Sequence, residues 1–219
     1  MHAVFFRSMP PVAAALLCLL APLAGAHGQT RIVVRGGAAF PMGDYDQTAE
    51  GLDLFARIGW TAGLELRVPV VESMALFASW DRVSNPVDEK ELEEAGGITA
   101  RVTADDHVAN AVMVGLRLEG SPSPNTLLGI QGGVGLAAFD MADYAVEDGN
   151  QVTWDSARKF AFMGGFSFAV SRVELAFRFY PLGHFHHDGR VDTGRDEVLL
   201  EDIPAPVRVS TITLGVILP

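Results

Sequence analysis

Residues 54–68 of the chain read LFARIGWTAGLELRV, and this stretch decides the fold class. A first set of side chains falls on one face of an extended chain: Leu54, Ala56, Ile58, Trp60, Ala62, Leu64, Leu66 and Val68. The opposite face carries Arg57, Gly59, Thr61, Gly63, Glu65 and Arg67. Strict alternation of this kind is typical of a β-strand, whose successive side chains point to opposite sides. The run is far longer than the five or six residues of an average globular strand. It predicts a long strand with one apolar and one polar face.

Seven further stretches read as strands, separated alternately by tight turns and by longer polar loops. They are Arg31–Phe40, Met74–Val83, His107–Glu119, Thr126–Met141, Arg158–Val170, Val173–Tyr180 and Pro206–Leu218. An even number of strands of this length, with long and short links in turn, is typical of an up-and-down barrel that crosses a membrane. We therefore predict an all-β fold, an eight-stranded antiparallel up-and-down transmembrane β-barrel.

Periodicity alone does not separate this fold from a soluble barrel, because the two differ only in which face points outward. Three features favour the membrane. The apolar faces repeat Phe, Leu, Val and Trp, whereas the opposite faces mix glycine, alanine and charges, as suits a narrow lumen. Aromatic residues recur near strand ends (Phe40, Trp80, Phe139, Tyr180), as in interface girdles. Acidic residues collect in the long loops. The alternative is a secreted, soluble, lipocalin-like barrel that binds a small apolar ligand.

The first 26 residues have the layout of a secretory signal peptide. Arg7 supplies a positive start, residues 12–23 are apolar, and Ala24-Gly25-Ala26 offers small residues for cleavage. We expect a signal peptide over 1–26 and a single barrel domain over 27–219. The only cysteine, Cys18, lies in the segment to be removed, so the mature chain is expected to form no intramolecular disulfide.

The charge of the chain limits its partners. The formal net charge is −11, and without Arg7 there are 15 basic against 27 acidic residues. Such a chain should repel nucleic acid, because binding to phosphate depends on Lys and Arg. Acidic loops such as residues 88–94 are most simply solvated, although they could bridge divalent cations at a lipopolysaccharide surface. The expected partners are outer-membrane lipid and lipopolysaccharide, and we expect a monomer.

Charged residues on the inner faces form the main candidate site. This lumen charge network comprises Arg35, Arg57, Glu65, Arg67, Arg117, Glu119, Lys159, Glu174 and Arg178. The interior of an eight-stranded barrel is just wide enough to be filled by side chains. Because an unpaired buried charge costs several kcal/mol, we expect these groups to pair and to plug the barrel. A proton or ion path through the network is the functional alternative.

Other candidate chemistry is weaker. His184 and His186 would share a strand face and could hold a divalent metal with Asp188, while His187 lies between them. No fourth ligand is apparent, so a solvated loop is the simpler interpretation, and we predict neither a metal nor a cofactor. Ser210 and His184 could serve a lipid-modifying enzyme, but nothing fixes their distance. We predict no catalytic residues and no enzyme.

Two segments carry a resemblance to a known family. They are residues 35–44, RGGAAFPMGD, and residues 210–218, STITLGVIL, at the first and last strands. Here the chain resembles the small outer-membrane β-barrel family, the OmpA/OmpX-like eight-stranded barrels of Gram-negative bacteria. The resemblance implies an outer-membrane location, insertion by the barrel-assembly machinery, and a structural or surface-recognition role for the long loops.

Overall fold

The structure is a computed structural model that describes residues 29–42, 54–97, 100–147 and 149–219. The signal peptide expected over 1–26 lies outside these residues, so its cleavage and the start of the domain at residue 27 stay predictions. No helix within the described ranges is long and apolar enough to cross a lipid bilayer.

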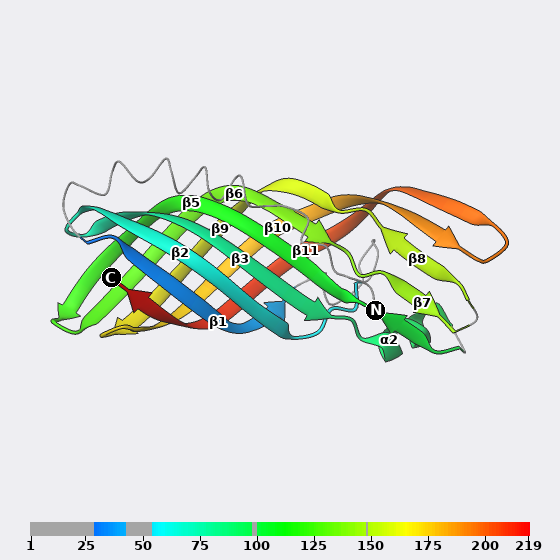
Figure 1. Cartoon of the computed structure of the whole chain (residues 1–219), viewed down its shortest axis with the longest axis horizontal. Helices are drawn as coiled ribbons and strands as arrows, with labels where there is room; N and C mark the ends of the chain where they lie inside the picture. Colours follow the sequence, from blue (N-terminus) through cyan, green and yellow to red (C-terminus); the bar gives the residue numbers. More distant parts are fainter. Residues whose placement is uncertain (1–28, 43–53, 98–99, 148) are drawn as a thin grey trace.

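Eight long strands form a closed antiparallel ring. They are β1 (Arg31–Pro41), β2 (Gly59–Val71), β3 (Met74–Pro86), β5 (Asp106–Ser123), β6 (Thr126–Asp140), β9 (Ala157–Val170), β10 (Val173–Asp192) and β11 (Glu197–Leu218). Each pairs with the next along the chain, and β11 pairs with β1, with Val34 opposite Val216, so the sheet closes on itself (Figure 1). Closure satisfies the backbone hydrogen bonds of every wall strand, as a lipid environment requires. The predicted fold class is confirmed.

One end of the barrel carries an extension, which we call the head (residues 87–105, 141–156 and 183–206, of which the structure describes all but 98, 99 and 148). It contains α2 (Glu89–Gly96), β4 (Val102–Ala104), β7 (Tyr144–Val146) and β8 (Gln151–Trp154). The strands β8, β7 and β4 extend the sheet from the part of β10 that projects beyond the barrel, in the order β11-β10-β8-β7-β4. The short turns of the barrel lie at the opposite end, with the C-terminus, on the left of Figure 1. The barrel therefore has one end closed by short turns and one end that carries the head.

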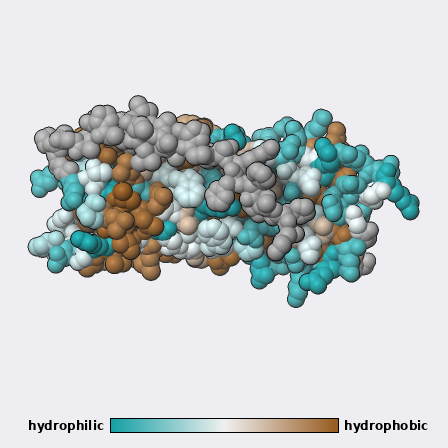
Figure 2. Space-filling view, viewed as in Figure 1, coloured by the Kyte–Doolittle hydropathy of each residue, from teal (hydrophilic) through white to brown (hydrophobic). Residues whose placement is uncertain are grey.

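The polarity of the barrel is inverted relative to a soluble protein. The outward, exposed side chains include Val34, Trp60, Leu64, Leu116, Leu118, Leu128, Ile130, Leu136, Phe160, Phe162, Phe166, Phe168, Leu175, Ile212, Leu214 and Val216. In contrast, Glu65, Arg117 and Glu174 point inward and are at most 1% exposed. Figure 2 shows the brown surface toward the short-turn end and the teal surface over the head. A soluble barrel needs the reverse arrangement, so the wall faces lipid.

Two segments differ from the expectation. Residues 54–58 do not extend β2. Phe55 has a φ of 47°, and Leu54 and Ala56 are buried among core side chains; Ala56 makes a single bridge to Val87. The left-handed φ at Phe55 interrupts the extended chain before β2, so Leu54, Phe55 and Ala56 enter the core instead of facing lipid, while Arg57 and Ile58 stay exposed. Conversely, the polar loop expected before the last strand is a long hairpin, since β10 and β11 pair as far as Asp192 and Glu197.

The lumen is divided into two layers. Toward the short-turn end it is filled by charged side chains, described below. Toward the head it is filled by an apolar cluster that includes Met113, Phe139, Met163 and Phe185, each at most 3% exposed. The barrel is therefore packed along its axis, as expected for eight strands.

Candidate functional site in the barrel lumen

The charged layer, which we call the lumen network, is built from inward positions of five strands. Arg35 comes from β1, Glu65 and Arg67 from β2, Asp81 from β3, Arg117 from β5, and Glu174 and Arg178 from β10. All seven are at most 4% exposed. Each is placed there by strand alternation, since residues two or four apart share a face: Glu65 with Arg67, and Glu174 with Arg178.

The half of the network nearer the short-turn end centres on Glu174. Arg67 donates two hydrogen bonds to it, at 2.8 Å from Nη1 to Oε2 and 2.6 Å from Nη2 to Oε1. Arg117 Nη2 donates to Glu174 Oε2 at 3.1 Å and to Ser167 Oγ at 2.6 Å, while its Nη1 donates to Gln131 Oε1 at 2.7 Å. Two guanidinium groups thus share one carboxylate, and the neutral side chains of Gln131 and Ser167 accept further hydrogen bonds from Arg117.

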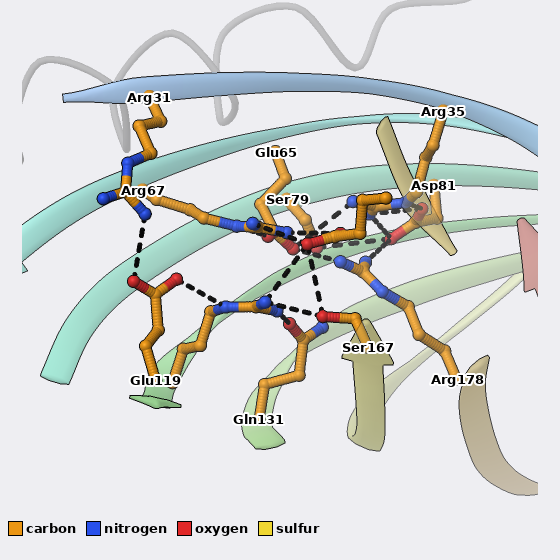
Figure 3. A network of polar contacts seen from close by, with 12 residues as sticks. Arg31, Arg35, Glu65, Arg67, Ser79, Asp81, Glu119, Gln131, Ser167 and Arg178 are labelled. Carbon is orange, nitrogen blue, oxygen red and sulfur yellow. Dashed lines mark hydrogen bonds and ion pairs between the residues drawn. The ribbon is translucent and has the colours of Figure 1, made fainter. Parts of the chain in front are cut away.

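The other half centres on Asp81. Arg35 Nη2 lies 2.6 Å from Oδ1 and 2.9 Å from Oδ2 of Asp81, and Arg178 Nη1 donates to Oδ2 at 3.1 Å. The Tyr180 hydroxyl also donates to Oδ2, at 2.9 Å. Figure 3 shows Arg35, Asp81 and Arg178 pointing toward one another. Glu65 joins the halves because it contacts Arg35, Arg67 and Arg178.

The network reaches the aqueous rim at the short-turn end through one further pair. Arg117 Nε donates to Glu119 Oε1 at 2.8 Å, and Arg31 Nη1 donates to Glu119 Oε2 at 3.0 Å. The Arg31 side chain is 35% exposed, against 9% for Glu119. Polar contacts therefore run from the partly exposed Arg31 at this rim to Asp81, which accepts from the Tyr180 hydroxyl. Figure 3 shows the part of this series from Arg31 and Glu119 to Asp81 and Arg178.

The arrangement occludes the lumen. In the described part of the chain, Arg67, Arg117 and Arg178 in the charged layer and Phe139 and Phe185 in the apolar layer are each at most 1% exposed. Side chains so enclosed leave no water-filled passage beside them. Because paired buried charges are costly to separate, the geometry favours a rigid plug that links strands on different sides of the barrel.

Most predicted members of the network meet in the lumen, and two do not. Arg35, Glu65, Arg67, Arg117, Glu119, Glu174 and Arg178 are joined by the contacts above. Arg57 is a correction: its side chain is 64% exposed and its Nε lies 3.4 Å from Asp88 Oδ2, because it precedes β2 in the segment that leaves the barrel wall. Lys159 is also a correction. It is exposed at the head end of β9, where its Nζ donates to the backbone oxygen of His184 at 2.9 Å.

Sequence reasoning missed several members of the network, of which Asp81 matters most. The others are Arg31, Ser79, Gln131, Ser167 and Tyr180. Asp81 could have been found by assigning faces to Met74–Val83, where Leu76, Ala78 and Trp80 alternate with Phe77, Ser79 and Asp81.

Strand alternation places the histidines of residues 184–187 on opposite faces of β10. Phe185 and His187 face the core, whereas His184 and His186 are exposed on the other side. His186 Nδ1 lies 2.7 Å from Asp202 Oδ1, and Asp188 Oδ1 accepts from the Asp202 backbone N–H at 3.0 Å. Within the described ranges, no three His, Cys, Asp or Glu residues are grouped so as to hold a metal ion.

The serine of the alternative lipid-enzyme pair is also engaged elsewhere. His184 is paired in register with Pro206, four residues along β11 from Ser210. At about 3.3 Å per residue this is a separation of roughly 13 Å along the strand. The Ser210 hydroxyl lies 2.6 Å from the sulfur of Met42. The two side chains thus do not form a catalytic pair.

A closed eight-stranded antiparallel barrel with an ionic lumen and an apolar wall defines a class, the small transmembrane β-barrels of outer membranes. No family model matches the chain, and no curated protein does. Among solved structures, a major outer membrane protein from Thermus thermophilus is similar, with a TM-score of 0.54 and 13% identity over 87% of this chain and 99% of that one. At such identity the likeness is one of fold.

Two further solved structures are similar at lower scores. Ail, the attachment invasion locus protein of Yersinia pestis, solved in complex with the heparin analogue sucrose octasulfate, has a TM-score of 0.49 and 12% identity, covering 87% of this chain and all of that one. Neisserial surface protein A has a TM-score of 0.46 and 13% identity, covering 86% and 96%. The fold implied by the resemblance to OmpA/OmpX-like barrels is confirmed by the topology and by the Thermus structure.

Proposed function

We propose that the protein is an integral outer-membrane barrel that acts as a closed anchor and presents the head at the cell surface for recognition. The observation that carries this proposal is the contrast between the two parts. The lumen is filled by paired charges and apolar side chains, while the head continues the sheet well beyond the apolar belt, the band of exposed apolar side chains on the wall that includes Trp60, Leu116, Phe162 and Leu214. Recognition in such proteins resides in loops held by a rigid scaffold.

A closed anchor should not conduct ions. We expect the full chain, reconstituted in planar bilayers, to show no large, stable single-channel conductance. Protection of the barrel from protease, together with accessibility of the head, would verify that the protein has inserted. Stable conductance of an open pore would contradict the plug and favour the alternative of an ion path through the lumen network.

The proposed role is not enzymatic. It is supported by the separation of His184 from Ser210 and by the engagement of Ser210 with Met42. Comparison of lipid A and phospholipid from cells with and without the gene tests this point, and we expect identical lipid profiles. A deletion that changes lipid acylation, restored by the wild-type gene but not by His184→Ala, would overturn it.

The charge of the head supports a proposal about its partners. Its three ranges hold 16 Asp and Glu against four Lys and Arg, whereas the rest of the chain has 11 acidic against 12 basic residues. The whole net negative charge therefore lies in the head. Such a field attracts cationic partners and repels polyanions. We propose that the head recognises basic surfaces, or lipopolysaccharide through bridging divalent cations.

This proposal predicts that the head does not bind sulfated polysaccharides. Ail was solved with a sulfated heparin analogue, but the acidic head described here should not bind one. We expect surface plasmon resonance to show no binding of heparin and clear binding of polylysine, the latter lost at about 0.5 M salt as charges are screened. In parallel, chelation of divalent cations should release co-purifying lipopolysaccharide. Heparin binding would overturn the assignment of the head as a cation-recognising surface.

A further inference from the structure

Two buried imidazoles lie where the barrel joins the head, outside the apolar belt and apart from the lumen network. His107, at the start of β5, is 3% exposed, and His187, on β10, is 1% exposed. Both contact the ring of Phe139, His107 by stacking at 5.8 Å between centroids and His187 edge-on at 5.5 Å. Phe185 also packs against Phe139, at 5.5 Å. The two histidines, which we call the histidine pair, thus sit in a largely aromatic layer.

The histidine pair makes hydrogen bonds to the backbone of three connecting segments. His107 Nε2 lies 2.7 Å from the carbonyl oxygen of Leu54, in the segment leading to β2, and the backbone N–H of Ala142 donates to His107 Nδ1 at 3.0 Å. His187 Nδ1 lies 2.7 Å from the carbonyl oxygen of Asp155, between β8 and β9. The contacts on His107 set its tautomer, because Nδ1 accepts from an amide and Nε2 must then donate.

These contacts suit neutral rings only. A second proton on His107 would go to Nδ1 and oppose the N–H of Ala142, so that hydrogen bond would be lost. On His187, Nδ1 donates to Asp155, and Nε2 has no hydrogen-bond partner among the described residues. A proton there would place a buried N–H beside Phe139 and Phe185 without an acceptor, which is costly.

We propose that the histidine pair is an acid-sensitive latch: acidification protonates both imidazoles and releases the connections at Leu54, Ala142 and Asp155, loosening the head while the barrel wall stays closed. Burial lowers the pKa of His107 to about 4, although the Leu54 carbonyl and Asp106 oppose the shift. Burial also lowers the pKa of His187, opposed by the Asp155 carbonyl and by Asp140.

The direction of the effect follows from these shifts. A released histidine titrates near pH 6.5, so the released state binds protons more readily than the latched one. The stability of the latch is therefore complete above about pH 6.5 and is lost as the pH falls toward 4. For His107 alone, the equilibrium moves toward release by roughly 30-fold between pH 7.4 and pH 5.

Other titratable groups surround the pair and must be distinguished from it. They are Asp106 on β5, Asp140 at the end of β6, Asp143 before β7, Asp155 before β9, and His186 and Asp188 on β10, with Arg57 in the segment that carries Leu54. Burial raises the pKa of Asp143, whose carboxylate accepts from the Trp154 N–H at 2.8 Å, so this residue is the main competing acid sensor.

Hydrogen–deuterium exchange of the full chain in detergent micelles, corrected for the intrinsic pH dependence of exchange, tests the proposal. We expect residues 54–58, 139–143 and 153–157 to exchange at least tenfold faster at pH 5 than at pH 7.4, with residues 128–136 of the wall unchanged. The double variant His107→Gln/His187→Gln keeps neutral donors and should abolish the acceleration. The exposed His186→Gln is the matched control and should keep it.

Two results would overturn the latch: equal protection at both pH values, or an acceleration that persists in the double variant, which would assign it to carboxylates such as Asp143. If the double variant does not fold, NMR titration of the wild-type histidine C2 protons decides. Two imidazoles that titrate below pH 6, together with the loss of amide protection, support the proposal. Titration of both near pH 6.5 refutes it.

Discussion

Arg67 and Glu174 face each other across the lumen in a two-bonded ion pair, with N···O distances of 2.6 and 2.8 Å, although 107 residues separate them in the chain. The pair joins β2 to β10, which are not neighbours in the sheet. Both side chains are 1% exposed. The ion pair therefore links two non-neighbouring strands through the barrel interior, whereas the backbone hydrogen bonds of the wall link only neighbouring strands.

The Arg67–Glu174 ion pair yields the first prediction. Removing one partner leaves the buried network with one unbalanced charge, so Glu174→Leu and Arg67→Met should each destabilise the barrel by about 3–5 kcal/mol. The double variant should lose far less, because an apolar pair of similar volume replaces both charges. Urea unfolding in lipid vesicles, followed by the heat-modifiable gel shift, measures each value. If the double variant loses as much unfolding free energy as the two single variants together, the cycle would show that Arg67 and Glu174 do not interact.

The lumen shows that the sequence could predict which side chains face inward but not which of them pair. Alternation alone placed Glu65, Arg67 and Glu174 inside, because a strand that faces lipid leaves its polar side chains only the lumen. The same rule misplaced Arg57, because it assumes an uninterrupted strand and cannot anticipate the left-handed Phe55 that turns the chain away. The partners within the lumen depend on stagger and tilt between strands, which alternation does not report. Asp81 thus had no predicted partner.

The head was not foreseen for a different physical reason. Residues 183–206 contain Gly, Pro, His and many charges, which are typical of loops. They pair nonetheless, with irregularities in register between Tyr180 and Gly183 and between His187 and Gly189. Because β10 and β11 leave the barrel already aligned as a hairpin, each further residue pair adds no new loop-closure cost, so weak strand formers can continue the ladder.

A second prediction concerns the space around Arg117. A Cβ at Gly129 would lie 2.1 Å from Arg117 Nη2 and 2.4 Å from its Cζ, and the guanidinium is held by Gln131, Ser167 and Glu174. Gly129→Ala should therefore cost about 1–3 kcal/mol of unfolding free energy through overpacking. At Gly164 a Cβ would meet nothing within 4 Å. Gly164→Ala is the matched control, with an expected change within about 0.5 kcal/mol. Equal effects in urea titration would refute the tight packing of Arg117.

The third prediction concerns the free edge of the head sheet at β4. Glu93 Oε1 accepts from the Val102 N–H at 2.7 Å, and Glu89 Oε1 accepts from the Ala104 N–H at 3.1 Å. Helix α2 thus covers β-sheet donors that could otherwise pair with another chain. Glu89→Ala/Glu93→Ala should speed amide exchange at Val102 and Ala104 and promote association through the head, seen by light scattering of the purified protein in detergent.

The control for this edge keeps the acceptor but removes the charge. Glu89→Gln/Glu93→Gln retains a side-chain oxygen at each position, so it should remain protected and monomeric. Glu94→Ala removes an exposed carboxylate from the same helix without touching β4 and should also have no effect. If the Gln pair behaves like the Ala pair, charge rather than hydrogen bonding protects the edge, and the contact assigned to α2 is wrong.

The fourth prediction tests lipid contact with two leucines of equal exposure on one strand. Leu214 and Leu199 both lie on β11 and are both 63% exposed, but Leu214 is in the apolar belt and Leu199 is in the head. In water the two would tolerate charge equally. In a membrane, Leu214→Arg should cost about 2–4 kcal/mol, whereas Leu199→Arg should be close to neutral. Folding yield into phosphatidylcholine vesicles and urea midpoints compare the two variants. Equal, small effects would mean that water surrounds both positions, and the inverted polarity of the wall would then not reflect a membrane.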